Sequence, residues 1–194
     1  MGIEIERKFT VKELPFDLDK FPYHVIEQGY LNVHPAVRVR REDNIYYMTY
    51  KGTPSGAEKH EASGADNKKN GGEIGKVEYN MPLDETSYKH MLTKADGNII
   101  SKKRYLIPLN EDGFEKEYLD NNLDIKRAVD EGKIKIELDI FEGKYEGTIL
   151  AEVEFPNEES AQKYHKASWF KDDVTGNIQY SNSYRSIVKV NSTL

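Results

Sequence analysis

The sequence has 194 residues, of which 32% are charged, and a formal net charge of -6 at pH 7. This length fits one domain, and the acidic balance argues against a nucleic-acid partner, because nucleic-acid binding favours a basic face. The absence of cysteine excludes disulfides and thiolate metal sites. No apolar run is long enough to span a bilayer, and residues 1–10 lack the apolar core of a secretory signal. We therefore expect a cytoplasmic protein that does not associate with membranes.

Eight segments predict β-strands, because they are rich in β-branched and aromatic residues and alternate polar with apolar positions. Short polar connections at 42–44 and 142–144 predict hairpins, which join antiparallel neighbours. The expected strands are 3–11, 25–33, 36–41, 45–51, 73–81, 98–109, 133–141 and 146–155.

Two helices are expected outside these strands, and a third segment is a weaker candidate. Residues 84–94 follow Pro82, and residues 157–170 begin with Asn157 as an N-cap and an acidic first turn. The weaker candidate is 119–131.

The segment 52–75 has almost no bulky apolar residue and is dense in Gly, Ser, Asn and Lys, which predicts a mobile loop. No shift in composition demands a second domain. We therefore expect 1–194 to form a single domain with insertions near 53–73 and 110–132.

Pairs of like charges, two residues apart, recur in five of the expected strands. Residues two apart share one face of a strand at a spacing of roughly 6.7 Å, while their neighbours face the other side. The neighbours here are mostly apolar. Three pairs are acidic and two are basic: Glu4 and Glu6, Arg38 and Arg40, Lys102 and Arg104, Glu137 and Asp139, and Glu152 and Glu154.

A single pair of this kind is most simply a solvated strand face. Five pairs favour a shared interior, because like charges repel and a solvated face would mix Thr, Ser and Lys. An eight-stranded antiparallel sheet can close into a barrel whose interior receives one set of alternating residues. Carboxylates bind Mg²⁺ or Mn²⁺, whereas Arg and Lys bind phosphate oxygens. The pattern therefore predicts a metal and polyphosphate site inside a barrel.

The segment Glu4-Ile5-Glu6-Arg7-Lys8 fits the pattern E-x-E-x-K, and further charged motifs follow it in order. Together they resemble the CYTH superfamily, the triphosphate tunnel metalloenzymes, over nearly the whole chain apart from the two insertions. The motifs that carry the resemblance are Gln28-Gly29-Tyr30-Leu31, Arg38-Val39-Arg40, Lys51-Gly52, Lys102-Lys103-Arg104-Tyr105, Glu137-Leu138-Asp139 and Glu152-Val153-Glu154-Phe155. Asp173-Val174-Thr175-Gly176 followed by Tyr180-Ser181-Asn182 resembles the C-terminal segment of the short bacterial members.

The resemblance implies an α+β fold, mainly antiparallel β, with a closed eight-stranded barrel and helices packed outside. It implies hydrolysis of a small-molecule triphosphate with Mg²⁺ or Mn²⁺ as cofactor, and it leaves a homodimer open. The implied catalytic residues are Glu4, Glu6, Lys8 and Glu154. The implied triphosphate ligands are Lys8, Arg38, Arg40, Lys51, Lys102 and Arg104. The implied metal ligands are Glu4, Glu6, Glu152 and Glu154, with Glu78, Glu137 and Asp139 as further candidates.

One strand departs from the pattern of many members, which carry an Arg followed by Glu-x-Glu. Here Lys76 replaces the Arg and cannot form its bidentate fork, and Asn80 lacks the charge of the second carboxylate. The number of metals and the preferred substrate therefore stay open. The alternatives are a class IV adenylate cyclase and a non-catalytic polyphosphate-binding protein. Because no motif indicates a base or ribose pocket, we expect inorganic tripolyphosphate to be preferred over ATP.

Overall fold

The computed structural model describes residues 2–52 and 75–188, and the structural statements below concern these residues. The insertion predicted near 53–73 lies outside them. The strand predicted at 73–81 is described from Gly75 onward.

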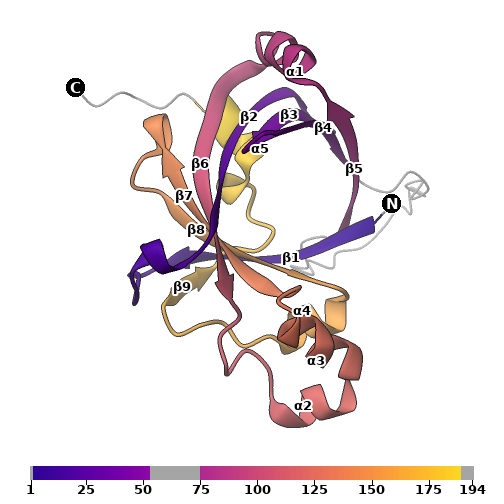
Figure 1. Cartoon of the computed structure of the whole chain (residues 1–194), viewed down its shortest axis with the longest axis vertical. Helices are drawn as coiled ribbons and strands as arrows, with labels where there is room; N and C mark the ends of the chain where they lie inside the picture. Colours follow the sequence, from indigo (N-terminus) through magenta and orange to yellow (C-terminus); the bar gives the residue numbers. More distant parts are fainter. Residues whose placement is uncertain (1, 53–74, 189–194) are drawn as a thin grey trace, which may run out of the picture.

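The predicted antiparallel, β-rich α+β fold is confirmed. Nine strands form one sheet in the order β5-β4-β3-β2-β6-β7-β8-β1-β9, and every paired neighbour is antiparallel (Figure 1). The bounds are β1 (Gly2–Val11), β2 (Tyr23–Val33), β3 (Ala36–Glu42), β4 (Ile45–Gly52), β5 (Gly75–Leu83), β6 (Asp96–Pro108), β7 (Lys135–Glu142), β8 (Ile149–Phe155) and β9 (Phe170–Asp173).

The sheet curves strongly, but it is not closed into the predicted eight-stranded barrel. Strand β1 pairs with β5 over only four residue pairs, from Gly2 to Ile5. Further along the same edge of β1, β9 pairs with Phe9 and Val11, and Val174 donates its backbone N–H to the carbonyl oxygen of Lys8. From Lys8 onward, β9 and Val174 therefore occupy the edge of β1 that β5 shares at its start.

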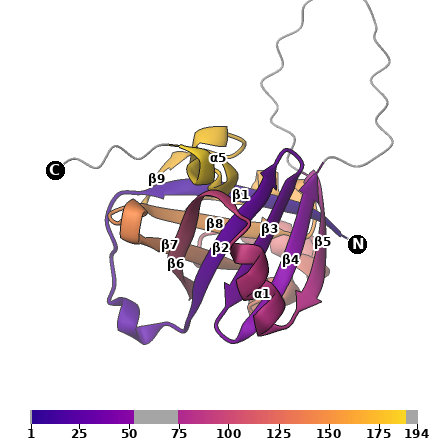
Figure 2. The same ribbon diagram turned by 90° about the horizontal axis from the view of Figure 1, so that it is seen from above.

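Five α-helices accompany the sheet: α1 (Glu85–Leu92), α2 (Lys116–Asn121), α3 (Leu123–Asp130), α4 (Glu158–Lys163) and α5 (Asn182–Ile187). Figure 1 shows α2, α3 and α4 gathered on one side of β1, opposite the arch of β2 to β5, while α1 lies outside that arch. In the orthogonal view of Figure 2, α5 lies above the sheet, where it packs against β6 and β2. Among residues 2–52 and 75–188, no helix is long and apolar enough to cross a membrane.

The helix expected at 157–170 is shorter than predicted, since α4 ends at Lys163. Its start agrees with the prediction, because the side chain of Asn157 caps it. Near its end, Arg7 of β1 donates a hydrogen bond to the carbonyl oxygen of Tyr164 at 2.8 Å, which satisfies that group without a further helical turn. The chain then turns into β9, a strand that the sequence prediction missed.

The helix expected at 119–131 is two helices, α2 and α3. They are separated by Asn122, whose backbone lies outside the helical region at φ -130° and ψ 73°. The side chain of Asn122 donates to the carbonyl oxygen of Tyr118 at 2.8 Å and so replaces a helical backbone bond at the break. The insertion predicted near 110–132 therefore contains ordered helices.

The alternating strands divide the sheet into an apolar face and a charged face. Residues such as Phe9, Leu138 and Val153 are fully buried in the largest core cluster, which also includes Ile125 of α3 and Ala161 of α4. Helices therefore cover the apolar face, and the charged residues between these positions project to the opposite face, where the candidate site lies.

Candidate active site

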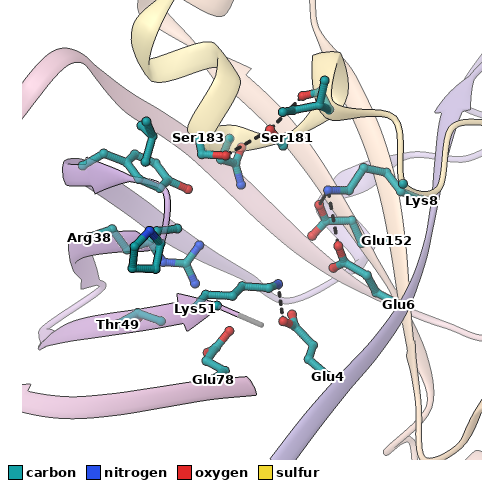
Figure 3. A pocket seen from close by; sticks show the side chains of 18 of the residues that line it. Glu4, Glu6, Lys8, Arg38, Thr49, Lys51, Glu78, Glu152, Ser181 and Ser183 are labelled. Atoms are coloured by element: carbon teal, nitrogen blue, oxygen red, sulfur yellow. Dashed lines mark hydrogen bonds and ion pairs between the residues drawn. The ribbon is translucent and has the colours of Figure 1, made fainter. Parts of the chain in front are cut away.

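A cavity of about 590 Å³ lies on the charged face of the sheet (Figure 3). Of the ten charged residues predicted to share one interior, seven line it, from β1, β3, β6 and β8. Lys8, Lys51 and Glu78 line it as well. The seven are Glu4, Glu6, Arg38, Arg40, Arg104, Glu152 and Glu154.

The predicted metal ligands Glu4, Glu6 and Glu154 lie together on β1 and β8. Each offers one carboxylate oxygen, and the three oxygens lie within 4.8 Å of one another. Mg²⁺ binds oxygens at about 2.1 Å, so adjacent ligands of one ion are about 3 Å apart and opposite ligands about 4 Å. The three carboxylates therefore fit one divalent cation after a small adjustment, with its remaining positions free for water or phosphate.

The same crowding changes the acidity of Glu154. Partial desolvation in the cavity and the negative charges of Glu137 and Glu4 raise the pKa of Glu154 to about 8. No ion pair to Glu154 is present in the described part of the chain. A cation bound at this cluster would favour the ionised form of its carboxyl group.

The opposite wall of the cavity is basic and comes from β3 and β4. The Nε of Arg38 is buried and has no hydrogen-bond partner among residues 2–52 and 75–188, although a buried polar group usually has one. Arg40 is held more firmly, since its Nε donates to Gln28 at 3.0 Å and its Nη1 to the hydroxyl of Tyr47 at 3.2 Å. Arg38 thus has a buried Nε–H available for an anionic ligand.

Two lysines pair with carboxylates of the cavity, and one of them, Lys51, links the basic wall to the acidic wall. Lys51 of β4 makes an ion pair with Glu4, and Lys8 lies 2.8 Å from Glu152 and 3.6 Å from Glu6 (Figure 3). Burial would raise the pKa of Glu152, but the charges of Lys8 and Arg104 hold that pKa well below its usual range. Glu152 is therefore ionised and already paired.

Three of the ten predicted residues, Lys102, Glu137 and Asp139, do not line the cavity. Lys102 and Asp139 are fully buried and form an ion pair, and Arg104 contacts Asp139, Glu137 and Glu152. Burial and the neighbouring charge of Arg104 lower the pKa of Lys102 to about 8. In the described structure these groups bind one another, although the sequence pattern treats Lys102 as a phosphate ligand.

On β5, Asn80 makes a defined contact in place of the expected second carboxylate. Its Oδ1 accepts a hydrogen bond from Thr49 at 2.7 Å, and its Nδ2 donates to Glu78 at 3.0 Å. Glu78 and Thr49 line the cavity. Asn80 therefore orients Glu78 and adds no negative charge of its own.

Uncharged residues of the cavity were missed by the sequence prediction. Thr175, Ser181 and Ser183 of the C-terminal segment line the cavity beside the charged strands. This segment is anchored through α5, because the side-chain amide of Asn98 donates to the carbonyl oxygens of Arg185 and Val188. None of the three belongs to an alternating strand, since Thr175 follows β9, Ser181 caps α5 and Ser183 lies in α5. The signal in the sequence was the pair of C-terminal motifs, Asp173 to Gly176 and Tyr180 to Asn182.

The family comparison agrees with this arrangement. The CYTH domain family matches residues 2–171. The chain belongs to the CYTH family.

Two curated CYTH relatives match almost the whole chain. The inorganic triphosphatase of Nitrosomonas europaea is 27% identical over 183 residues, covering 92% of this chain and 93% of the relative. The inorganic triphosphatase of Acetivibrio thermocellus is 30% identical over 188 residues, covering 94% and 92%. The fold also matches a crystal structure of an inorganic triphosphatase with a TM-score of 0.59 and 25% sequence identity, and the match covers 97% of each chain.

Proposed function

We propose that this chain is a metal-dependent hydrolase that cleaves a phosphoanhydride bond of a triphosphate, with inorganic tripolyphosphate as its preferred substrate. The observation that carries the proposal is the cavity in which three clustered carboxylates face Arg38 and Lys51. Both curated relatives are named inorganic triphosphatases, and each matches more than nine-tenths of the chain. A cytoplasmic location stays a prediction, as do the single domain and the homodimer.

The proposed roles follow from the chemistry of each wall. Glu4, Glu6 and Glu154 would hold the cation, because CYTH triphosphatases are generally metal-dependent and three carboxylates suit Mg²⁺ or Mn²⁺. Arg38 and Lys51 would bind phosphate oxygens. When bound, the cation supplies neutralisation of the negative charge on the phosphate oxygens.

The protein residues contribute mainly position and charge. Phosphoryl transfer requires little covalent chemistry from a protein, so catalysis depends on holding the phosphates in line with the attacking water and on stabilising charge. Arg38 offers fixed donors, and Arg40 is held in place by Gln28 and Tyr47. The pairs of Lys8 with Glu6 and Glu152 would keep the Lys8 ammonium directed at the same space.

The predicted ligand roles of three residues are revised in the proposal. Lys102 is fully buried and paired with Asp139, so we propose that it supports Arg104 and does not bind phosphate itself. We propose the same supporting role for Asp139, and for Glu137, which also pairs with Arg104. A second metal would depend on Glu78, to which Asn80 donates a hydrogen bond.

The test is phosphate release from tripolyphosphate, ATP and thiamine triphosphate, each with Mg²⁺, with Mn²⁺ and with EDTA, alongside an assay for cyclic AMP. We expect the highest kcat/KM with tripolyphosphate and no activity in EDTA, since the identified ligands all suit phosphate oxygens. Cyclic AMP as the main product would replace the proposal with a cyclase. Tight binding without any turnover would replace it with a polyphosphate-binding protein.

A further inference from the structure

The lining of the cavity is balanced in formal charge, with five carboxylates and five Lys or Arg side chains. Much of this charge is also paired directly, across the cavity from β4 to β1 or within the neighbouring strands β1 and β8. Lys51 contacts Glu4, and Lys8 contacts Glu6 and Glu152. Two of the three carboxylates of the candidate metal cluster therefore have a lysine where a cation would bind.

This pairing weakens the binding of each of the two ligands when that ligand binds alone. A divalent cation at Glu4 must compete with the ammonium of Lys51, and a phosphate group at Lys51 must compete with the carboxylate of Glu4. When both ligands bind, the cation contacts Glu4 and the phosphate contacts Lys51, so each side chain of the pair has a partner of opposite charge. The competition that weakens single binding is then removed.

We propose that the Lys51–Glu4 ion pair couples cation binding to triphosphate binding, so that the site takes the metal–triphosphate complex in preference to either ion alone. The proposal rests on the proposed function and deepens it by naming the form of the substrate. Coupling of this kind is reciprocal, so the factor by which triphosphate raises cation affinity equals the factor by which the cation raises triphosphate affinity.

The positions of Lys51 and Glu4 allow each side chain to leave the other and contact a ligand. Lys51 lies near the end of β4, where the chain leaves the sheet, and Glu4 lies on β1, which pairs only briefly with β5. The side chains of Lys51 and Glu4 are 20% and 18% exposed, so either ligand can reach them from the cavity. By contrast, Lys102 and Asp139 are both 0% exposed, and no ligand can reach that pair.

The experiment measures the binding of Mn²⁺ by calorimetry or electron paramagnetic resonance, without turnover. In Lys51→Met, Mn²⁺ alone should bind more tightly than in the wild type, by a factor on the order of 10, as is typical of coupled sites. Arg38→Met is the matched control, because it removes a positive charge from the same wall that makes no ion pair with the cluster. It should change Mn²⁺ affinity much less.

A reciprocal measurement uses tripolyphosphate in EDTA, where hydrolysis does not proceed. Glu4→Gln should bind tripolyphosphate more tightly than the wild type, and Glu111→Gln, at an exposed residue outside the cavity lining, should not. This variant tests the proposal independently if Lys51→Met does not fold.

Coupling itself is measured with imidotriphosphate, a non-hydrolysable analogue. Saturation with the analogue should raise Mn²⁺ affinity more in the wild type than in Lys51→Met. The direct contact between analogue and Mn²⁺ is present in both proteins, so the difference between the two increases reports the contribution of Lys51. The proposal is overturned if Lys51→Met and Arg38→Met change Mn²⁺ affinity equally, or if the coupling factor survives Lys51→Met. Because no arm uses turnover, coupling without phosphate release would refute the hydrolase and leave the coupling intact.

Discussion

Two groups of charged residues on the same face of the sheet behave differently. In the cavity, Glu4, Glu6, Glu154 and Arg38 line open space. Lysines pair with Glu4 and Glu6, but Glu154 has no ion pair and Arg38 has a buried donor without a partner in the described chain. Further along β6 and β7, Lys102, Arg104, Glu137 and Asp139 bind one another. The first group is an open cluster, and the second group is a closed network.

A charged pair at i and i+2 therefore identifies a polar interior but does not identify a binding site. Both groups have the same spacing in sequence. The open cluster and the closed network differ in the residue that strand register places opposite each charge on the neighbouring strand. Arg104 of β6 lies opposite Asp139 of β7, whereas Glu6 of β1 lies opposite Glu154 of β8. Opposite charges neutralise each other, and like charges require an external counter-ion. Changes in the closed network should therefore affect stability, and changes in the open cluster should affect activity.

The largest effect is expected in the closed network. Asp139→Asn leaves Lys102 buried without its anion, and breaking such a buried pair costs about 3–5 kcal/mol in the free energy of unfolding. Lys102→Met should cost less, because Asp139 keeps its bonds from Arg104. Urea unfolding measures both variants. A cost for Asp139→Asn no larger than that of Asp120→Asn, an exposed control, would contradict the comparison.

The second-largest effect is expected in the open cluster, on kcat/KM. Glu6→Gln removes one of three clustered carboxylates and should lower kcat/KM at least about 100-fold, since even supporting residues of metal sites are worth 10–100-fold. Its melting temperature should stay the same or rise, because a repulsive charge is removed. Glu111→Gln, an exposed residue without a hydrogen bond or ion pair in the described structure, is the activity control. A Glu6→Gln enzyme that turns over normally would exclude the cluster from catalysis.

The basic wall should show a smaller effect on the same reaction. Arg38→Met removes a charge-assisted contact to phosphate, which is worth about 1.5–3 kcal/mol, or roughly 10- to 150-fold in kcat/KM. Millimolar sulfate should raise the melting temperature of the wild type, because the anion binds only the folded state, and Arg38→Met should reduce that shift. Arg127→Met, exposed on α3, should retain it. The absence of any sulfate shift in the wild type would argue against a phosphate site.

Sequence alone predicted the strands well, because each carries both a β-propensity and a two-residue alternation. It placed Glu4, Glu6, Arg38 and Glu154 correctly at one cavity. It could not separate the open cluster from the closed network, since pairing across strands depends on register. It also missed β9, a four-residue strand whose partner lies at the start of the chain, and with β9 it missed the strand that pairs with β1 beyond β5.

The smallest predicted effect concerns the outer side of β1, where Arg7 holds the strand that bears Glu6 and Lys8. Arg7 donates to Asp173, and Asp173 accepts from the hydroxyl of Thr175, which in turn accepts from the backbone N–H of Lys8. Burial would raise the pKa of Asp173, but the hydrogen bonds from Thr175 and Arg7 outweigh it and lower that pKa below its usual value.

A lowered pKa in the folded state means that the contribution of Asp173 to stability is present above its unfolded pKa and is lost as pH falls through the folded value. Asp173→Asn should therefore destabilise the protein at pH 7 and lose this deficit in acid, below about pH 4. The side chain is 38% exposed, so solvent screening limits the deficit to about 1 kcal/mol or less. Urea unfolding at pH 7 and in acid, with Asp120→Asn as control, measures it. A deficit that persists unchanged in acid would mean that Asp173 acts through its shape and not its charge, and that the attachment of β1 to β9 does not depend on the ion pair with Arg7.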